Sequence, residues 1–139
     1  MFRIATNPDD LIKVFIVRGI VFLEEQNVPY AIEMDDYENS ATHILGEIDG
    51  EPFAAGRIRF IEDFAKLERI AVRKDFRGKS YGHQIVDFML DIAKSRGYKK
   101  FTLHAQAHLR SFYEQHGFHV CGELFKEANI DHFPMQREE

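Results

Sequence analysis

The sequence predicts a mixed α/β fold whose sheet is mainly antiparallel and carries helices on its faces. Three observations support this prediction. First, two segments in which apolar and polar residues alternate flank a dipeptide typical of a tight turn. Second, the spacing of apolar residues then changes from every second residue to the 3.6-residue period of a helix. Third, a strand–helix–strand unit follows. Because the crossover between two strands joined by a helix is right-handed and makes them parallel, we expect one parallel pair inside the antiparallel sheet.

The N-terminal part is predicted to be a short strand followed by a long helix. Phe2–Ala5 has the composition of a strand, and Asn7 is placed to cap a helix with Pro8 at its first position. Two aspartates then face the positive end of the helix dipole, and we expect the helix to continue to about Gln26. Residues 27–41 lack apolar periodicity, which predicts a loop or a short irregular helix.

An antiparallel meander is predicted next. Thr42–Ile48 and Pro52–Phe60 flank Asp49-Gly50, a dipeptide typical of the tight turns that join two strands of a hairpin. A third strand is expected over Phe64–Val72.

The C-terminal half alternates between helical and strand patterns. Apolar residues between Ile85 and Ala93 lie at helical spacing, and Gly97 is placed to end that helix. A strand, a second helical face and two closing strands follow at Phe101–His104, Leu109–His116, Phe118–Leu124 and Phe133–Gln136.

Composition limits the classes of protein that fit. The 139 residues, 45% of them hydrophobic, are expected to form one domain over residues 1–139. No window approaches the ~20 apolar residues of a membrane span, and the charged N-terminus lacks the apolar core of a signal peptide, so we expect a cytoplasmic protein. A net charge of −5 disfavours a nucleic-acid partner, because affinity for phosphate backbones comes largely from Lys and Arg.

The cysteine and the histidines of the sequence predict neither a metal site nor a thiol nucleophile. Cys121 is the only cysteine, which excludes an internal disulfide, and its apolar surroundings predict a small core residue rather than an acyl-cysteine. His104 and His108 do not share a helix, and Gly117 interrupts the spacing between His116 and the next histidine. We therefore expect no metal.

A glycine-containing turn lies between the Phe64–Val72 strand and the helix after it. Such a turn aims backbone N–H groups at one spot that favours an anion, although an ordinary strand-to-helix turn also uses glycine. A P-loop would need glycine where Arg73 stands, and the dinucleotide fingerprint would need glycine where Ser80 stands. Kinase and Rossmann interpretations are thereby weakened.

The turn Arg77-Gly78-Lys79-Ser80-Tyr81-Gly82 resembles the pyrophosphate loop of the GNAT N-acyltransferase superfamily, Q/R-x-x-G-x-G/A. Ser80 replaces the first motif glycine; a serine with negative φ fits there, and its hydroxyl can contact phosphate or cap the helix. The segment Gln106–Phe118 is similar to the family's N-x-x-A-x-x-F-Y-x-K-x-G-F stretch and retains Phe112, Tyr113, Gly117 and Phe118. Three further segments resemble a subgroup of small bacterial members with few assigned substrates: Phe22–Pro29, Ala41–His43 and Ile130–Met135.

The resemblance implies acetyl-CoA as the acyl donor. In the family, the strand that corresponds to residues 66–72 carries a bulge and splays from its parallel neighbour, and the pantetheine arm enters the resulting V. The implied cofactor contacts are Ile70, Ala71, Val72, Arg77, Gly78, Lys79, Ser80, Tyr81, Gly82, His83, Gln106 and Phe112.

The chemistry of acetyl transfer needs a base, an oxyanion donor and an acid. Glu68, two residues before Ile70, is the leading base, with a salt-bridged strand glutamate as the alternative interpretation. A backbone N–H near Ile70 is the expected oxyanion donor. Tyr113 is the expected acid for the departing thiolate, with a buried core tyrosine as its alternative.

The acceptor contacts expected from the sequence are Glu25, Gln26, His43 and His132. His132 precedes the last strand and is also an alternative base. The acidic run from Glu24 to Glu38 either attracts a cationic amine or is a solvated loop.

These residues together predict an acetyl-CoA-dependent N-acetyltransferase that acts by direct transfer in a ternary complex. The acceptor would be a primary amine on a small molecule or peptide, and the protein a monomer or homodimer. The alternatives are a CoA-binding sensor or interaction domain without transferase activity, and a nucleotide-dependent phosphotransferase.

Overall fold

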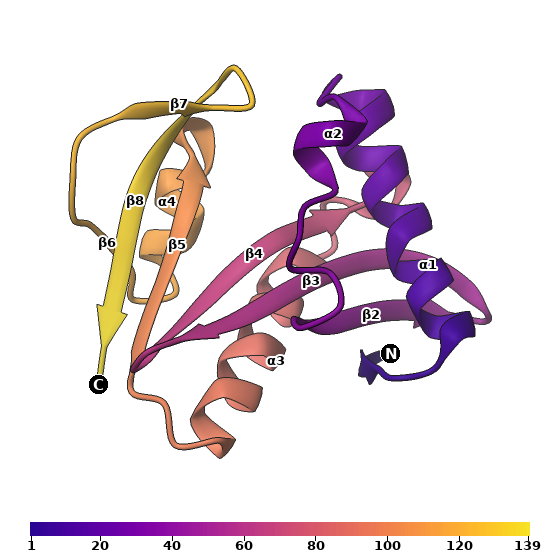
Figure 1. The fold of residues 1–139 in the computed structure, drawn as a ribbon, viewed down its shortest axis with the longest axis horizontal. Helices are drawn as coiled ribbons and strands as arrows, with labels where there is room; N and C mark the ends of the chain where they lie inside the picture. The colour runs from indigo at the N-terminus through magenta and orange to yellow at the C-terminus, as the bar shows by residue number, and fades with distance from the viewer.

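A computed structural model describes residues 1–139 and shows one eight-stranded sheet with helices around it (Figure 1). The strands are β1 (Phe2–Ala5), β2 (Thr42–Ile48), β3 (Glu51–Ile61), β4 (Phe64–Val72), β5 (Lys100–Gln106), β6 (His119–Val120), β7 (Phe125–Glu127) and β8 (Ile130–Glu138). Their order is β1-β2-β3-β4-β5-β8-β6, and β7 pairs with β8 beside this path. Only β4 and β5 are parallel.

The helices cover both faces of the sheet, as predicted. They are α1 (Pro8–Arg18), the π-helix η1 (Gly19–Glu25), α2 (Tyr30–Glu33), the 3₁₀ turns η2 (Lys74–Phe76) and η3 (Ala107–Leu109), α3 (Tyr81–Ser95) and α4 (Arg110–Glu114). Val14, Val17 and Val21 of α1 and η1 form a small core against the β2–β4 strands. The apolar face of α3 builds the larger core on the other side, where a Cβ on Gly56 would lie 2.6 Å from the Met89 sulfur.

The parallel strands β4 and β5 diverge. They pair only over Phe64–Lys66 and Lys100–Thr102, and beyond these residues they open into the V that separates the two halves of the molecule in Figure 1. On its other edge β4 carries a β-bulge, because Arg69 and Ile70 together face Gly56 of β3. Arg69 has φ +54°, so the kink is local to the strand. The predicted fold class, with its splayed parallel pair, is confirmed.

The meander follows the predicted boundaries closely. Asp49 and Gly50 both have positive φ, 51° and 80°, as a primed two-residue turn requires. Helix 1 continues to Glu25, but from Gly19 it is a π-helix rather than an α-helix. None of the helices has the length and apolar character needed to cross a membrane.

The C-terminal strands depart from the prediction. The strand expected over Phe118–Leu124 is only the two-residue β6, and the hairpin of β7 with β8 was missed. That hairpin turns at Ala128 and Asn129, which both have positive φ without the glycine that usually signals such a turn. The expectation of a core cysteine was therefore wrong, because Cys121 lies just after β6 and is exposed.

Candidate active site

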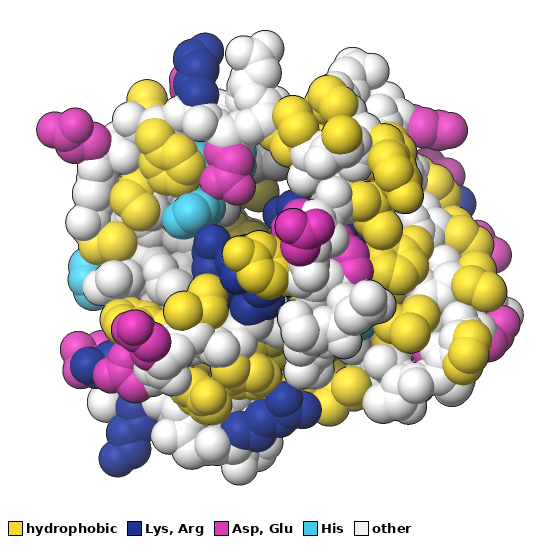
Figure 2. Space-filling view, viewed as in Figure 1, with side chains coloured by type: hydrophobic (Ala, Val, Ile, Leu, Met, Phe, Trp, Pro, Cys, Tyr) yellow, Lys and Arg dark blue, Asp and Glu magenta, His cyan; other side chains and the backbone are white.

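A pocket fills the V between β4 and β5. It holds about 930 Å³ of empty space up to its open mouth, and its wall comes from the bulged part of β4, the end of β5, η1 and the β7–β8 hairpin. The space-filling view shows a hollow near the centre of this face, with charged and histidine side chains beside it (Figure 2). Six of the predicted site residues line the pocket: Gln26, Glu68, Ile70, Gln106, Tyr113 and His132. Phe112 is outside the wall and packs against Tyr113.

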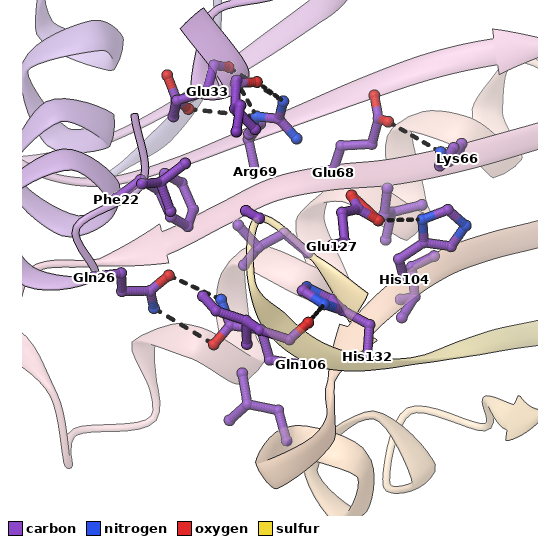
Figure 3. A pocket seen from close by; sticks show the side chains of 18 of the residues that line it. Phe22, Gln26, Glu33, Lys66, Glu68, Arg69, His104, Gln106, Glu127 and His132 are labelled. Atoms are coloured by element: carbon purple, nitrogen blue, oxygen red, sulfur yellow. Dashed lines mark hydrogen bonds and ion pairs between the residues drawn. The ribbon is translucent and has the colours of Figure 1, made fainter. Parts of the chain in front are cut away.

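The π-helix delivers side chains from the N-terminal segment into this wall. A π-helical turn widens the helix and is frequent at functional sites, and here Phe22 and Gln26 face the pocket. The amide of Gln26 makes a reciprocal pair with Gln106 of β5: the Gln106 nitrogen donates at 2.9 Å and the Gln26 nitrogen at 3.4 Å (Figure 3). This amide pair ties η1 to the end of β5 across one end of the pocket.

Glu68, the leading base from the sequence, is bound by three cations. Its carboxylate accepts from Arg57 at 2.9 Å and from Arg59 at 2.7 Å, and the Lys66 ammonium lies 3.3 Å away. Burial alone would raise the pKa of Glu68, but the hydrogen bond from Arg59 and the charges of Arg57 and Lys66 outweigh it and lower the pKa to about 2. A carboxylate held this strongly in its charged form is a weak proton acceptor near neutral pH.

Replacing Glu68 by glutamine should therefore affect stability first. The free energy of unfolding should fall by about 3 kcal/mol, because the fully buried Arg57 loses a counter-charge. Since the folded-state pKa of Glu68 is depressed, its contribution is present above the ordinary value of 4.5 and is lost as pH falls toward about 2. Urea unfolding of Glu68→Gln, with the exposed Glu123→Gln as control, should show this loss, and the acid-induced loss of stability over that range should be smaller in the variant.

The wall of the pocket opposite β4 carries His104, Glu127 and His132. Of these three residues only His132 was expected in the site from the sequence. His104 of β5 and His132 of β8 lie on one face of the sheet, because His104 pairs with Pro134 and His132 with Gln106. The ring of Phe125 contacts both histidines, with centroid distances of 4.9 and 5.8 Å. His104 Nδ1 bonds the Glu127 carboxylate at 2.9 Å (Figure 3). Glu127 was missed because the hairpin that carries it was missed.

His132 presents one nitrogen to the pocket. Its Nδ1–H donates to the carbonyl of Ile130 at 2.7 Å, which leaves Nε2 as the lone-pair nitrogen of the neutral ring. The side chain is only 7% exposed, yet Nε2 bonds no protein group and is not enclosed. The hydrogen bond to Ile130 thus fixes the tautomer that a general base needs.

Tyr113 of α4 also lines the pocket. It is 7% exposed, packs edge-on against Phe112 and Phe118, and its hydroxyl bonds no protein group. Burial raises the pKa of the phenol above its usual value. The hydroxyl therefore stays protonated and can donate a hydrogen bond into the pocket.

The predicted phosphate turn follows β4 and opens α3. Ser80 has φ +66° and makes no side-chain cap, which corrects the expectation of a negative φ and a capping hydroxyl. The first N–H groups of α3 therefore have no partner from the Ser80 side chain. Arg77 donates to the Val72 carbonyl and makes a bidentate pair with Glu25, both contacts at 2.7 Å, so the turn is tied to β4 and η1.

Two predicted acceptor contacts lie outside the pocket wall. Glu25 is engaged by Arg77, and His43 is buried against Phe15, with its Nε2 on the Glu38 carbonyl. Ala71 and Val72 are also outside the wall and pair with β3 along one edge.

The acidic run is neither a solvated loop nor an uncompensated negative surface. Glu33 and Glu38 bind the buried Arg18, and Asp35 binds Arg57 and Arg69. This internal ion-pair network removes the basis for attracting a cationic amine through the run, because its central carboxylates already have cationic partners.

The comparisons with known proteins agree with this geometry. A family model described as an acetyltransferase (GNAT) domain matches residues 20–139. The chain belongs to the GNAT acetyltransferase family. It is 40% identical over 137 residues to YjcF of Bacillus subtilis, described as an uncharacterized N-acetyltransferase, and the alignment covers 97% of each chain.

Solved GNAT-type structures share the whole fold. ElaA of Escherichia coli is 31% identical, with a TM-score of 0.88 and 99% of each chain covered. An acyl-CoA N-acyltransferase from Pseudomonas aeruginosa is 26% identical, with a TM-score of 0.90 over 99% of this chain and 98% of that one. The family resemblance drawn from the two sequence motifs is confirmed.

Proposed function

We propose that the protein transfers an acetyl group from acetyl-CoA to a primary amine, with both substrates bound at once. The observation that carries the proposal is the pocket in the V between β4 and β5, whose wall joins the bulged part of β4 to His104 of β5 and His132 of β8. A structure of the same fold, a GNAT acetyltransferase from Elizabethkingia anophelis, is described with acetyl-CoA bound.

The donor would lie along β4. Its pyrophosphate would meet the unpartnered N–H groups between Gly78 and His83, where the α3 dipole favours an anion. Its pantetheine arm would run between β4 and β5. The amides of the arm would form hydrogen bonds with the side chains of Gln26 and Gln106 in place of the bonds that these two residues make to each other. The acetyl carbonyl would then reach the bulge, where we place the oxyanion donor at the N–H of Ile70, because bulged residues leave the ladder.

The proton on the acceptor ammonium would go to His132. Its Nε2 is accessible and oriented by the Ile130 carbonyl, whereas Glu68 is committed to three cations. The neutral amine then attacks the acetyl carbonyl and forms a tetrahedral intermediate. As its C–S bond breaks, the thiolate of CoA takes a proton from the Tyr113 hydroxyl, and the surplus proton of the amine nitrogen restores that hydroxyl as the amide forms. Glu68 remains a proposed site residue, but its role is to hold Arg57, Arg59 and Lys66 beside the pocket.

Replacing Tyr113 by phenylalanine should lower turnover and leave CoA binding nearly unchanged. The variant keeps the ring that packs on Phe112 and Phe118 and removes only the hydrogen-bond donor for the thiolate. We expect kcat to fall by roughly 10²-fold, the lower end of what a positioned acid contributes. Steady-state kinetics with calorimetric titration of CoA checks this, and wild-type kcat would remove Tyr113 from the mechanism.

Thermal unfolding with candidate donors tests the proposed cofactor. Acetyl-CoA at a hundredfold excess over its dissociation constant should stabilise the protein by about 2.7 kcal/mol and raise Tm accordingly. ATP with magnesium should give no comparable shift. A shift with ATP and none with acetyl-CoA would replace the acetyltransferase proposal by the phosphotransferase alternative.

A further inference from the structure

A chain of three hydrogen-bonded side chains, Asp87, His116 and His83, ends at the proposed phosphate turn. His83 Nδ1 lies 2.8 Å from His116 Nε2, and His116 Nδ1 lies 3.1 Å from the Asp87 carboxylate. His83 is the third residue of α3, and its ring stacks on Phe112 at 4.4 Å. Phe112 in turn lies within 3.4 Å of the Cβ position of Gly82, so the ring of His83 sits beside the turn.

The chain fixes where the protons lie. The Asp87 carboxylate only accepts, so His116 Nδ1 carries a hydrogen and His116 Nε2 has a lone pair. That lone pair accepts from His83, so Nδ1 of His83 carries its hydrogen. When His83 is neutral, its Nε2 therefore has a bare lone pair, and this atom bonds no protein group and is not enclosed.

We propose that binding of CoA at this turn takes up one proton, which adds to Nε2 of His83. The lone pair of this atom would repel a phosphate oxygen, whereas the protonated Nε2 can donate a hydrogen bond to it. The inference rests on the proposed function, because it concerns the phosphates of the same donor. The Asp87–His116 pair acts as the positioning unit: its negative end stabilises the positive charge that His83 acquires.

The charged groups around the hydrogen-bonded chain of Asp87, His116 and His83 favour protonation of His83 rather than of His116. Asp87 faces it from α3, and Arg137 of β8 donates to the His116 carbonyl at 2.8 Å while it is itself paired with Glu139. Burial lowers the pKa of His116, which keeps the middle ring neutral and able to accept. The proton taken up is thus held by the ring next to the turn.

Calorimetric titration of CoA in two buffers of different ionisation enthalpy measures the protons taken up. Near neutral pH the wild-type binding enthalpy should depend on the buffer, and the affinity for CoA should fall as the pH rises, because the complex holds one more proton than the free partners. His83→Gln should take up fewer protons and lose this pH dependence, whereas His119→Gln, at an exposed histidine outside the chain, should match the wild type. CoA's own titrating groups are common to all three titrations, so the difference reports His83.

Asp87→Asn distinguishes proton uptake from a packing role. Loss of the carboxylate should move the pH dependence of CoA affinity to lower pH, whereas a packing role would weaken binding equally at every pH. Equal proton uptake by the wild type and His83→Gln would overturn the inference and leave the proposed function intact. Failure of the wild type to bind CoA at any pH would instead contradict the proposed function.

Discussion

Replacing His132 by asparagine should reduce kcat by roughly 10²–10⁴-fold, the range that a positioned base contributes. Asparagine can keep a donor near the position of Nδ1, so the hydrogen bond to the Ile130 carbonyl can survive, but it has no counterpart of Nε2. Because His132 lies beyond the cofactor turn, the dissociation constant of CoA should not change. Steady-state kinetics and calorimetry on the same preparation measure both quantities.

The pH profile makes this prediction specific. A histidine base gives kcat/KM an acid limb, since the protonated ring cannot accept the amine proton, and His132→Asn should lack that limb. His119→Asn, at an exposed histidine on β6, serves as the control. If the acid limb persists in His132→Asn and disappears in Glu68→Gln, the base is Glu68.

Replacing Gly82 by glutamate should abolish detectable CoA binding. Gly82 lies in the first turn of α3, and a Cβ there would already lie 3.3 Å from the Phe112 ring. A carboxylate placed among the unpartnered N–H groups would occupy the anion site with its own charge and repel pyrophosphate. The fold should be retained, because Gly82 is only half-buried and the Phe112 ring is the one neighbour within 4 Å of the added Cβ.

Gly82→Ala separates the effect of charge from that of volume. Its methyl group needs only a small displacement of Phe112, so it should bind CoA with modestly reduced affinity. Titration calorimetry on both variants, with circular dichroism to confirm folding, checks the comparison. Wild-type affinity in the glutamate variant would show that pyrophosphate binds elsewhere.

The parts of the fold that local chemistry specifies were predictable from the sequence. Asp49-Gly50 supplies the positive φ values of its hairpin, and β4 has the predicted bounds, Phe64–Val72. The V and its bulge came from the family resemblance, because periodicity does not show where two paired strands separate.

Other features depend on long-range contacts that the sequence pattern does not encode. Glu68 is a base candidate by position, but Arg57 and Arg59 on the neighbouring strand determine its charge state. Similarly, the acidic run is neutralised by Arg18 and Arg57, which are distant in sequence. Glu127 became visible only with the β7–β8 hairpin, whose turn lacks glycine.

The most direct test of acetyl transfer is amine-dependent release of free CoA from acetyl-CoA, with the acetylated amine identified by mass spectrometry. A panel of alkyl amines, polyamines, aminoglycosides and peptide N-termini covers the proposed acceptor class. The wild type should release one CoA for each acetylated amine with at least one member, and His132→Asn should do so far more slowly. Binding of CoA without turnover of any amine would contradict the account and favour a CoA-binding sensor domain.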